Sequence, residues 1–320
     1  MKSELDPLPT PTNAEGTARR VGVEIELGAL EEGRVADILC ETLGGEAEKV
    51  HGKGWKVKGS SLGDLQVYLD SRYLDDDDNR RLAQVLREVA RNVVPVEIVT
   101  DPILPDQIAE FDEALDRLAA EGATGTAAGV FLGFGVHFNP EVTGSELSDI
   151  LPVVTAFALL EDHLRLIAGI DLARRALPFV DPYPRNLVDA LARGGLTSLE
   201  DLIDVYLKLA PSRNYALDML CLFAHLDRRR VSRSIDLTSI SPRPTYHFRL
   251  PDCRIDEPDW SLALEWNRWV LVERVANDPL LLNRLKRAWL EHRAALTTVR
   301  GDWAERSREI LLNGNVLCAR

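Results

Sequence analysis

Two glutamates stand two positions apart in the otherwise apolar stretch Val21-Gly-Val-Glu-Ile-Glu-Leu-Gly28. In a strand, side chains alternate between faces, so Glu24 and Glu26 would share one face and the aliphatic residues the other. Carboxylates at this spacing repel each other unless a cation or open water accommodates them. Oxygen ligands of this kind are the ones that Mg²⁺ takes in proteins. The pair is a candidate metal site, and an ordinary strand with one wet face is the alternative.

Four further segments alternate in the same way, and their polar rows carry groups suited to cations and phosphates. The segments contribute Asp70 from residues 65–70, Glu97 from 94–98, His137 and Asn139 from 131–139, and His247 and Arg249 from 245–250. An imidazole and an amide on one face can ligate a metal and hold a substrate. Arginine stays protonated, so Arg249 requires water, a carboxylate or a phosphate. Taken singly, Glu97 is typical of an exposed glutamate and His137 of a structural histidine.

Arg213 is a further candidate because it follows Pro211 and Ser212 at the expected start of a helix. A positive side chain there opposes the helix macrodipole, which favours anion binding over helix stability. An ordinary surface arginine is the alternative. The chain has no P-loop, GxSxG, HExxH, kinase or dinucleotide-binding motif. The polar rows of the strands therefore carry the functional signal.

The elements that would position these side chains form an antiparallel sheet covered on one face. A parallel sheet buried on both faces would show continuous apolar runs instead of alternation. Apolar residues at helical spacing separate the strands. The expected helices lie at 80–92 and 106–120, in a block from about 145 to 227 with a capping box at Thr197-Ser-Leu-Glu200, and from about 259 to 312.

Composition indicates a folded protein without a nucleic-acid surface. The 320 residues are 45% hydrophobic and 28% charged, with a formal charge of −13, whereas phosphate backbones require clustered Lys and Arg. Metal ions can still bridge acidic side chains to a nucleotide. No apolar run approaches the roughly 20 residues of a membrane span, and four scattered cysteines favour reduced thiols and a cytoplasmic location. Residues 1–18, with Pro7, Pro9 and Pro11, are expected to form a flexible tail.

The order of these motifs resembles the amidoligase family of the carboxylate–amine ligase superfamily, which includes glutamine synthetase and γ-glutamylcysteine ligase. The similar segments span about residues 19–250 and are Val21–Leu27, Leu65–Asp70, Val96–Pro102, Phe134–Asn139, Arg213–Asp218 and Tyr246–Arg249. Each motif is short, and their shared order and spacing carry the resemblance.

The resemblance implies an α+β fold, in which a curved antiparallel β-sheet has helices packed on one face, as in the catalytic fold of glutamine synthetase. Residues 19–320 would form a single catalytic domain, with residues 145–205 as a helical insertion. The implied activity is ATP- and Mg²⁺-dependent formation of an amide or isopeptide bond through an acyl phosphate, with Mn²⁺ able to substitute. The partners would be a small-molecule or peptide carboxylate and an amine, with no nucleic acid and no membrane.

Roles for individual residues follow from the same resemblance. The metal ligands would be Glu24, Glu26, Asp70, Glu97 and His137. Arg249 and, in second place, Arg213 would stabilise the charge on the transferring phosphoryl group. Asn139 would orient a substrate, and His247 is a candidate general base.

The chain also departs from the family pattern. His247 stands where a glutamate is usual, which affects one metal ligand. Asp218 stands where asparagine is common, and Ser60-Ser61-Leu62 lacks the aspartate that often precedes it, for which Asp70 is the substitute. Two other functions remain open: a metal-dependent hydrolase that uses the same acidic face without ATP, and a catalytically degenerate scaffold or binding protein. The superfamily contains monomers and large rings, so the oligomeric state is open as well.

Overall fold

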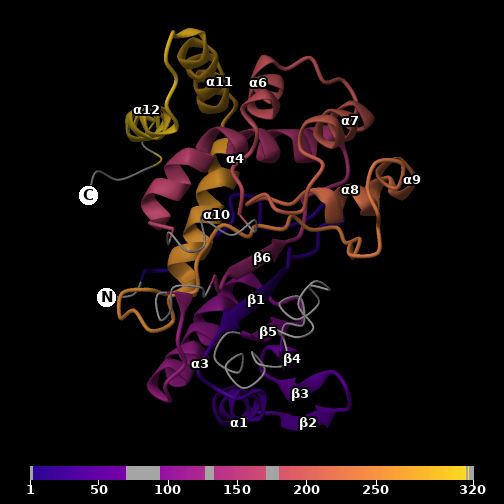
Figure 1. Ribbon diagram of the computed structural model, residues 1–320, viewed down its shortest axis with the longest axis vertical. Coiled ribbons are helices and arrows are strands. Elements are labelled where there is room, and N and C mark those ends of the chain that lie inside the picture. The colour runs from indigo at the N-terminus through magenta and orange to yellow at the C-terminus, as the bar shows by residue number, and fades with distance from the viewer. Residues whose placement is uncertain (1–2, 70–93, 127–132, 171–179, 315, 317–320) are drawn as a thin grey trace, which may run out of the picture.

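The computed structural model describes residues 3–69, 94–126, 133–170, 180–314 and 316. Its strands form a six-stranded antiparallel sheet in the order β2-β3-β4-β5-β1-β6 (Figure 1). They are β1 (Val21–Leu27), β2 (Glu46–Val50), β3 (Gly54–Ser60), β4 (Gly63–Leu69), β5 (Val96–Thr100) and β6 (Val136–Pro140). The predicted antiparallel sheet is confirmed. The sequence did not predict β2, a largely exposed edge strand rich in charged residues.

The register of β1 with its two neighbours divides the sheet into an apolar and a polar face. The aliphatic row of β1 has no exposed surface and consists of Val21, Val23, Ile25 and Leu27. Two helices pack on this face. Helix α1 (Glu32–Leu43) contacts β2, β3 and β4. Helix α10 (Leu262–Ala276) places the Trp266 ring edge-on to the Phe138 ring of β6, with the ring centroids 5.7 Å apart. Removing these side chains from water stabilises the sheet. The opposite face carries the glutamates.

Most of the remaining helices gather at one end of the molecule, beyond β6 (Figure 1). The helical elements are η4 (Pro105–Gln107), α3 (Ile108–Ala120), α4 (Leu147–Ala168), α6 (Arg185–Arg193), α7 (Leu199–Leu209), α8 (Leu220–Leu226), α9 (Arg228–Val231), α11 (Pro279–Ala294) and α12 (Arg300–Asn313). They confirm the predicted helix at 106–120, the central helical block and the C-terminal helices, whereas the helix expected at 80–92 lies outside the described residues. No helix in the described part of the chain combines the length and hydropathy needed to cross a bilayer.

The capping box before α7 lies one residue later than its predicted position. Ser198 is the N-cap, and its hydroxyl accepts a hydrogen bond from the backbone N–H of Asp201 at 3.1 Å. The Asp201 carboxylate in turn accepts from the backbone N–H of Ser198 at 3.0 Å. The capping box is therefore formed by Ser198 and Asp201. An aspartate at the third helical position here takes the role that glutamate usually has in this motif.

The segment predicted as a strand at 245–250 runs antiparallel beside β6 through isolated bridges. Thr245 is bridged to Glu141, and Phe248 to Phe138. The backbone N–H of Phe248 and the carbonyl of Phe138 lie 2.9 Å apart. This pairing continues the sheet beyond β6, so the polar row of the segment lies beside the polar row of β6.

The helix expected to begin at Arg213 is not formed, and α8 begins only at Leu220. Backbone pairing with residues 247–249 takes its place. Leu217 is bridged to Phe248, and the backbone N–H of Arg249 donates to the carbonyl of Ala216 at 2.8 Å. Residues held in an extended pairing cannot make helical hydrogen bonds, so the prediction of an arginine at a helix N-terminus was wrong.

Residues 3–18, for which composition predicts a flexible tail, make specific contacts with α10. The Trp266 indole donates to the carbonyl of Asp6 at 3.1 Å, and the Asn267 side chain bonds the backbone of Glu4 and Asp6. Leu8 is buried in the common core. These contacts arise from α10, far away in the sequence, so local composition could not reveal them.

Candidate metal and substrate site

Two buried glutamates face each other across the β1–β5 ladder. Glu26 is directly opposite Glu97, and their relative exposures are 5% and 3%. One carboxylate oxygen of Glu26 accepts a hydrogen bond from the backbone N–H of Gly135 at 2.7 Å. Opposed like charges destabilise a ladder, and burial increases the cost. The two carboxylates are therefore a candidate cation site.

Glu24 holds the side chains of β6 that lie beside it. Its Oε2 is 3.0 Å from Nδ1 of His137, and its Oε1 accepts from Nδ2 of Asn139 at 2.8 Å. Burial would raise the pKa of the Glu24 carboxyl, but the hydrogen bond with His137 and nearby basic groups, including Arg243, hold this pKa well below its usual value. A charged carboxylate only accepts, so Nδ1 of His137 carries the proton and Nε2 has the free lone pair.

Nδ1 of His247 faces both an acceptor, Oδ1 of Asn139, and a donor, Nη2 of Arg243, which lies 3.1 Å from it. Because Nδ2 of Asn139 donates to Glu24, its Oδ1 is an acceptor, and this oxygen is 2.8 Å from Nδ1 of His247. The two imidazoles lie edge to face with centroids 5.3 Å apart. Burial lowers the pKa of both His137 and His247, so both rings are neutral near pH 7. Each neutral ring thus offers one nitrogen lone pair, the form in which histidine binds metals, and in His137 this lone pair is on Nε2.

Two groups of side chains in this cluster have the spacing of metal ligands. Glu24, His137 and His247 form one group, and Glu26, Glu97 and His137 form the other, each with its ligand atoms within 4.8 Å of one another. Carboxylate oxygens suit Mg²⁺ and Mn²⁺, and an imidazole nitrogen is better suited to Mn²⁺ than to Mg²⁺. His247 therefore lies among the candidate ligands despite replacing the usual glutamate. Asp70, predicted as a further ligand, lies outside the described residues.

The two predicted arginines lie at different distances from the cluster. Arg249 is 7% exposed, and its positive charge contributes to lowering the pKa of both His137 and His247, after the larger effect of burial. Its Nη1 donates to the backbone carbonyl of Arg213 at 2.5 Å. Arg213 is one contact further out, where its Nε donates to the buried carboxylate of Asp218 at 2.9 Å. Arg249 is thus the better placed of the two to act on a bound anion.

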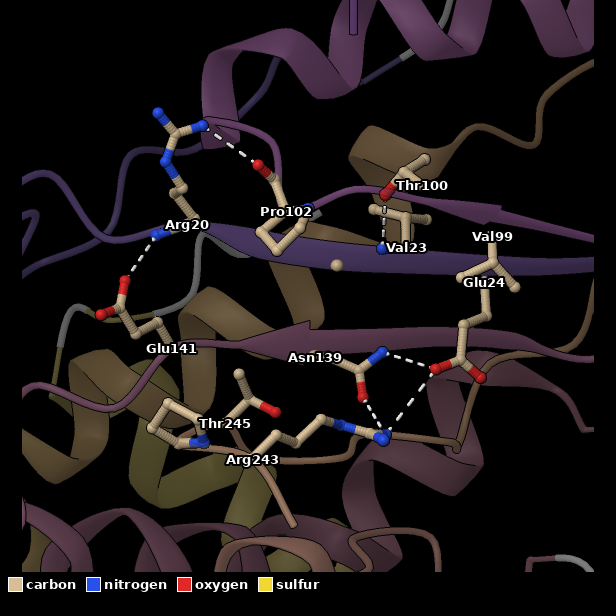
Figure 2. A pocket seen from close by; sticks show the side chains of 12 residues that line it. Arg20, Val23, Glu24, Val99, Thr100, Pro102, Asn139, Glu141, Arg243 and Thr245 are labelled. Atoms are coloured by element: carbon tan, nitrogen blue, oxygen red, sulfur yellow. Dashed lines mark hydrogen bonds and ion pairs between the residues drawn. The ribbon is translucent and has the colours of Figure 1, made fainter. Parts of the chain in front are cut away.

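Arg243 belongs to the cluster although the sequence analysis did not select it. Its Nη2 donates to Oδ1 of Asn139 at 2.6 Å and lies 3.7 Å from Oε1 of Glu24, as Figure 2 shows. The residue stands between Pro242 and Pro244, outside any alternating segment. A residue outside the alternating segments cannot be identified from strand periodicity. The two flanking prolines, which restrict the backbone, are the one local feature of the sequence that marks Arg243.

A pocket of about 440 Å³ adjoins the cluster at Glu24 and Asn139. Figure 2 shows Arg243 extending along it, with Arg20 and Glu141 at the end remote from Glu24. Its other polar contributors are Thr100 and Thr245. Pockets of this size accommodate small molecules. The polar face therefore combines a candidate metal cluster with a neighbouring substrate-sized pocket.

The fold and site agree with a comparison against known families. Residues 17–271 match a family described as putative amidoligase enzyme, and the chain belongs to this family. The match includes every described residue of the cluster and of the pocket. No curated protein and no solved structure matches the chain.

Proposed function

We propose that the protein is an ATP- and Mg²⁺-dependent carboxylate–amine ligase built on a glutamine synthetase-like sheet. Membership of the amidoligase family supports ligation as the class of reaction. The observation that carries the metal dependence is the buried pair Glu26 and Glu97, opposed on neighbouring strands beside His137. Two carboxylates and a neutral imidazole with ligand atoms within 4.8 Å of one another form a donor set that suits a divalent ion.

The proposed reaction has two steps. A carboxylate oxygen of the first substrate attacks the γ-phosphorus of ATP, the bond to the bridging oxygen breaks, and ADP leaves. The nitrogen of the amine then attacks the acyl carbon of the resulting acyl phosphate, inorganic phosphate leaves, and the amine gives up a proton. Phosphoryl transfer of this kind depends mainly on positioning and on charge stabilisation.

The residues of the cluster divide into ligands and supporting groups. Glu26, Glu97, His137 and His247 are the candidate ligands for Mg²⁺ or Mn²⁺. A bound ion would supply charge neutralisation for the phosphates. Glu24 orients His137, as carboxylates commonly do for metal-binding histidines. Arg249 would stabilise negative charge on the transferring group.

His247 is a better candidate for a ligand than for the general base. Its pKa is well below the usual value because the ring is buried, and a base works best with a pKa near the operating pH. One ring nitrogen of His247 lies within 4.8 Å of ligand atoms of Glu24 and His137. The proton of the attacking amine would then pass to solvent or to the released phosphate.

The test is phosphate release from ATP in a screen of carboxylate and amine pairs with Mg²⁺. We expect Glu26→Gln to abolish turnover while the protein stays folded, because the amide keeps the shape and removes the charge that holds the ion. The matched control is Glu200→Gln, an exposed glutamate in the first turn of α7.

Undiminished turnover in Glu26→Gln would contradict the assignment of Glu26 as a metal ligand. Metal-dependent hydrolysis of an amide without ATP consumption would replace the ligase by a hydrolase. Absence of Mn²⁺ binding and of any turnover would identify the chain as a catalytically degenerate member of the family.

A further inference from the structure

The pocket beside Glu24 has a charge composition that selects among ligands. Among the described residues its charged lining consists of two arginines, Arg20 and Arg243, and two glutamates, Glu24 and Glu141. A polyphosphate would meet as many negative as positive side chains there and would be disfavoured. A molecule with one negative and one positive group matches the lining. Under the proposed ligase function, the ATP phosphates would lie at the metal cluster and the pocket would take another substrate.

Each end of the pocket carries one arginine and one glutamate, and the Arg20 guanidinium at the far end already donates to the carbonyl of Pro102 at 3.0 Å. Arg243 reaches toward Glu24 and Asn139, at the end next to the metal cluster (Figure 2). Glu141 lies at the other end, where it accepts from Asn13 Nδ2 at 2.9 Å and from the backbone N–H of Arg20 at 3.0 Å. A carboxylate has lone pairs beyond these two bonds, so Glu141 can also accept from an ammonium group.

Two polar atoms of the lining have no hydrogen-bond partner within the described part of the chain. They are Nε of Arg243 and Oγ1 of Thr245, and both are buried. Buried polar groups are nearly always paired, and leaving one unpaired is costly. The guanidinium as a whole is partly exposed at the pocket, with a side-chain exposure of 28%. An oxyanion in the pocket, with a small shift of the Arg243 side chain, would supply the missing acceptor.

The pocket floor is open because it contains a glycine. Gly22 lies opposite Asn139 in the β1–β6 ladder and lines the pocket. A Cβ built at this position would lie 3.5 Å from Cβ of Asn139, an ordinary contact, so alanine fits the strand without a clash. Such a methyl group would instead take space from the pocket. Position 22 therefore allows the pocket to be narrowed without disturbing the fold.

We propose that this pocket binds an amino acid as a zwitterion, with its carboxylate toward Arg243 and Thr245 and its ammonium group toward Glu141. The carboxylate then lies next to Glu24, on the side where the metal cluster begins. That this carboxylate is the one that ATP activates rests on the proposed ligase function. Binding of the amino acid itself requires neither ATP nor metal.

Calorimetric titration of the full chain with each of the common L-amino acids, without nucleotide, tests the proposal. We expect one or a few of them to bind at a single site. Two analogues of that ligand, the amine without the carboxylate and the acid without the amino group, should each bind much more weakly. Arg243→Gln should weaken binding about tenfold or more, because a charge-assisted hydrogen bond is lost. Gly22→Ala should also weaken it, and Arg229→Gln, at an exposed position on α9, should not.

Failure of every amino acid to bind the wild type would overturn the proposal, and so would unchanged affinity in both Arg243→Gln and Gly22→Ala. If Arg243→Gln fails to fold, Gly22→Ala alone decides. Phosphate release measured on the same preparations separates the two claims. ATP turnover without amino-acid binding would contradict the amino-acid site and support the ligase function. Amino-acid binding without ATP turnover would support the site and contradict the ligase function.

Discussion

At the scale of single residues, the structure assigns different tasks to two glutamates that look equivalent in the sequence. Glu24 and Glu26 share a face of β1, as alternation predicts. Glu24 is engaged by His137 and Asn139, whereas Glu26 is opposed by a second carboxylate, Glu97. The first arrangement orients a histidine, and the second is the proposed cation site. Spacing in one strand identified the pair, but only the neighbouring strands separate the roles.

Replacing Glu24 by glutamine tests the orienting role. We expect Glu24→Gln to weaken Mn²⁺ binding by about 10- to 100-fold without abolishing it, because His137 loses its charged partner. A titration of Mn²⁺ followed by electron paramagnetic resonance measures the affinity. Affinity equal to that of the wild type would show that the Glu24–His137 contact has no part in metal binding.

At the scale of elements, the start of β1 is joined to α10 by a buried ion pair. The Arg19 guanidinium donates to both carboxylate oxygens of Glu273, at 2.8 and 2.7 Å, and the exposures of the two residues are 1% and 2%. The Trp269 indole donates to the same carboxylate at 2.8 Å. The pair fixes the strand that carries the glutamates to the helix on the apolar face.

We expect Arg19→Met to lower the free energy of unfolding by about 3–5 kcal/mol, because Glu273 is left as an uncompensated buried charge. The double variant Arg19→Met/Glu273→Met should recover most of the loss. Urea unfolding of the three proteins measures both effects. A loss in the single variant no larger than that in the double variant would contradict this account of the pair.

The packing of α12 on α4 is accompanied by a buried histidine. His163 of α4 is 1% exposed, and neither of its nitrogens has a hydrogen-bond partner among the described residues. Burial, aided by the positive charge of Arg308 on α12, lowers the pKa of His163 to about 4. Between pH 6.5 and pH 4 the unfolded chain binds a proton that the folded chain does not bind, so stability falls as the pH falls through this range.

The contribution of His163 to this loss is up to about 3 kcal/mol, from 1.36 kcal/mol per pKa unit. We expect His163→Leu to flatten the pH dependence of the unfolding free energy by this amount between pH 6.5 and pH 4. His225→Gln, at an exposed position of α8, is the control. An unchanged slope in His163→Leu would mean that the ring is solvated in the folded protein.

The local sequence pattern predicted the strands in which apolar and polar residues alternate. It failed for segments whose structure depends on contacts with residues far away in the chain. The strands that carry Glu24, Glu97 and His137 were found because one face of each is apolar. The helix expected at Arg213 was lost to pairing with residues 247–249, which lie some distance along the chain. Arg243 was missed for the same reason, because its place in the site depends on contacts with other strands.

At the scale of the whole molecule, the two faces of one sheet serve different purposes: one packs against helices, and the other carries the candidate site. Its apolar face and the helices α1 and α10 provide the stability, and its polar face collects charged groups from strands that are far apart in the chain. The family match over residues 17–271 spans both faces of the sheet.

The central claim is that Glu26 and Glu97 hold a divalent cation, and Mn²⁺ binding detected by electron paramagnetic resonance tests it without knowledge of the substrates. We expect the wild type to bind Mn²⁺, with Mg²⁺ competing, and Glu26→Gln and Glu97→Gln each to lose this binding while Glu200→Gln keeps it. Equal Mn²⁺ affinity in the wild type and in both cluster variants would contradict the claim.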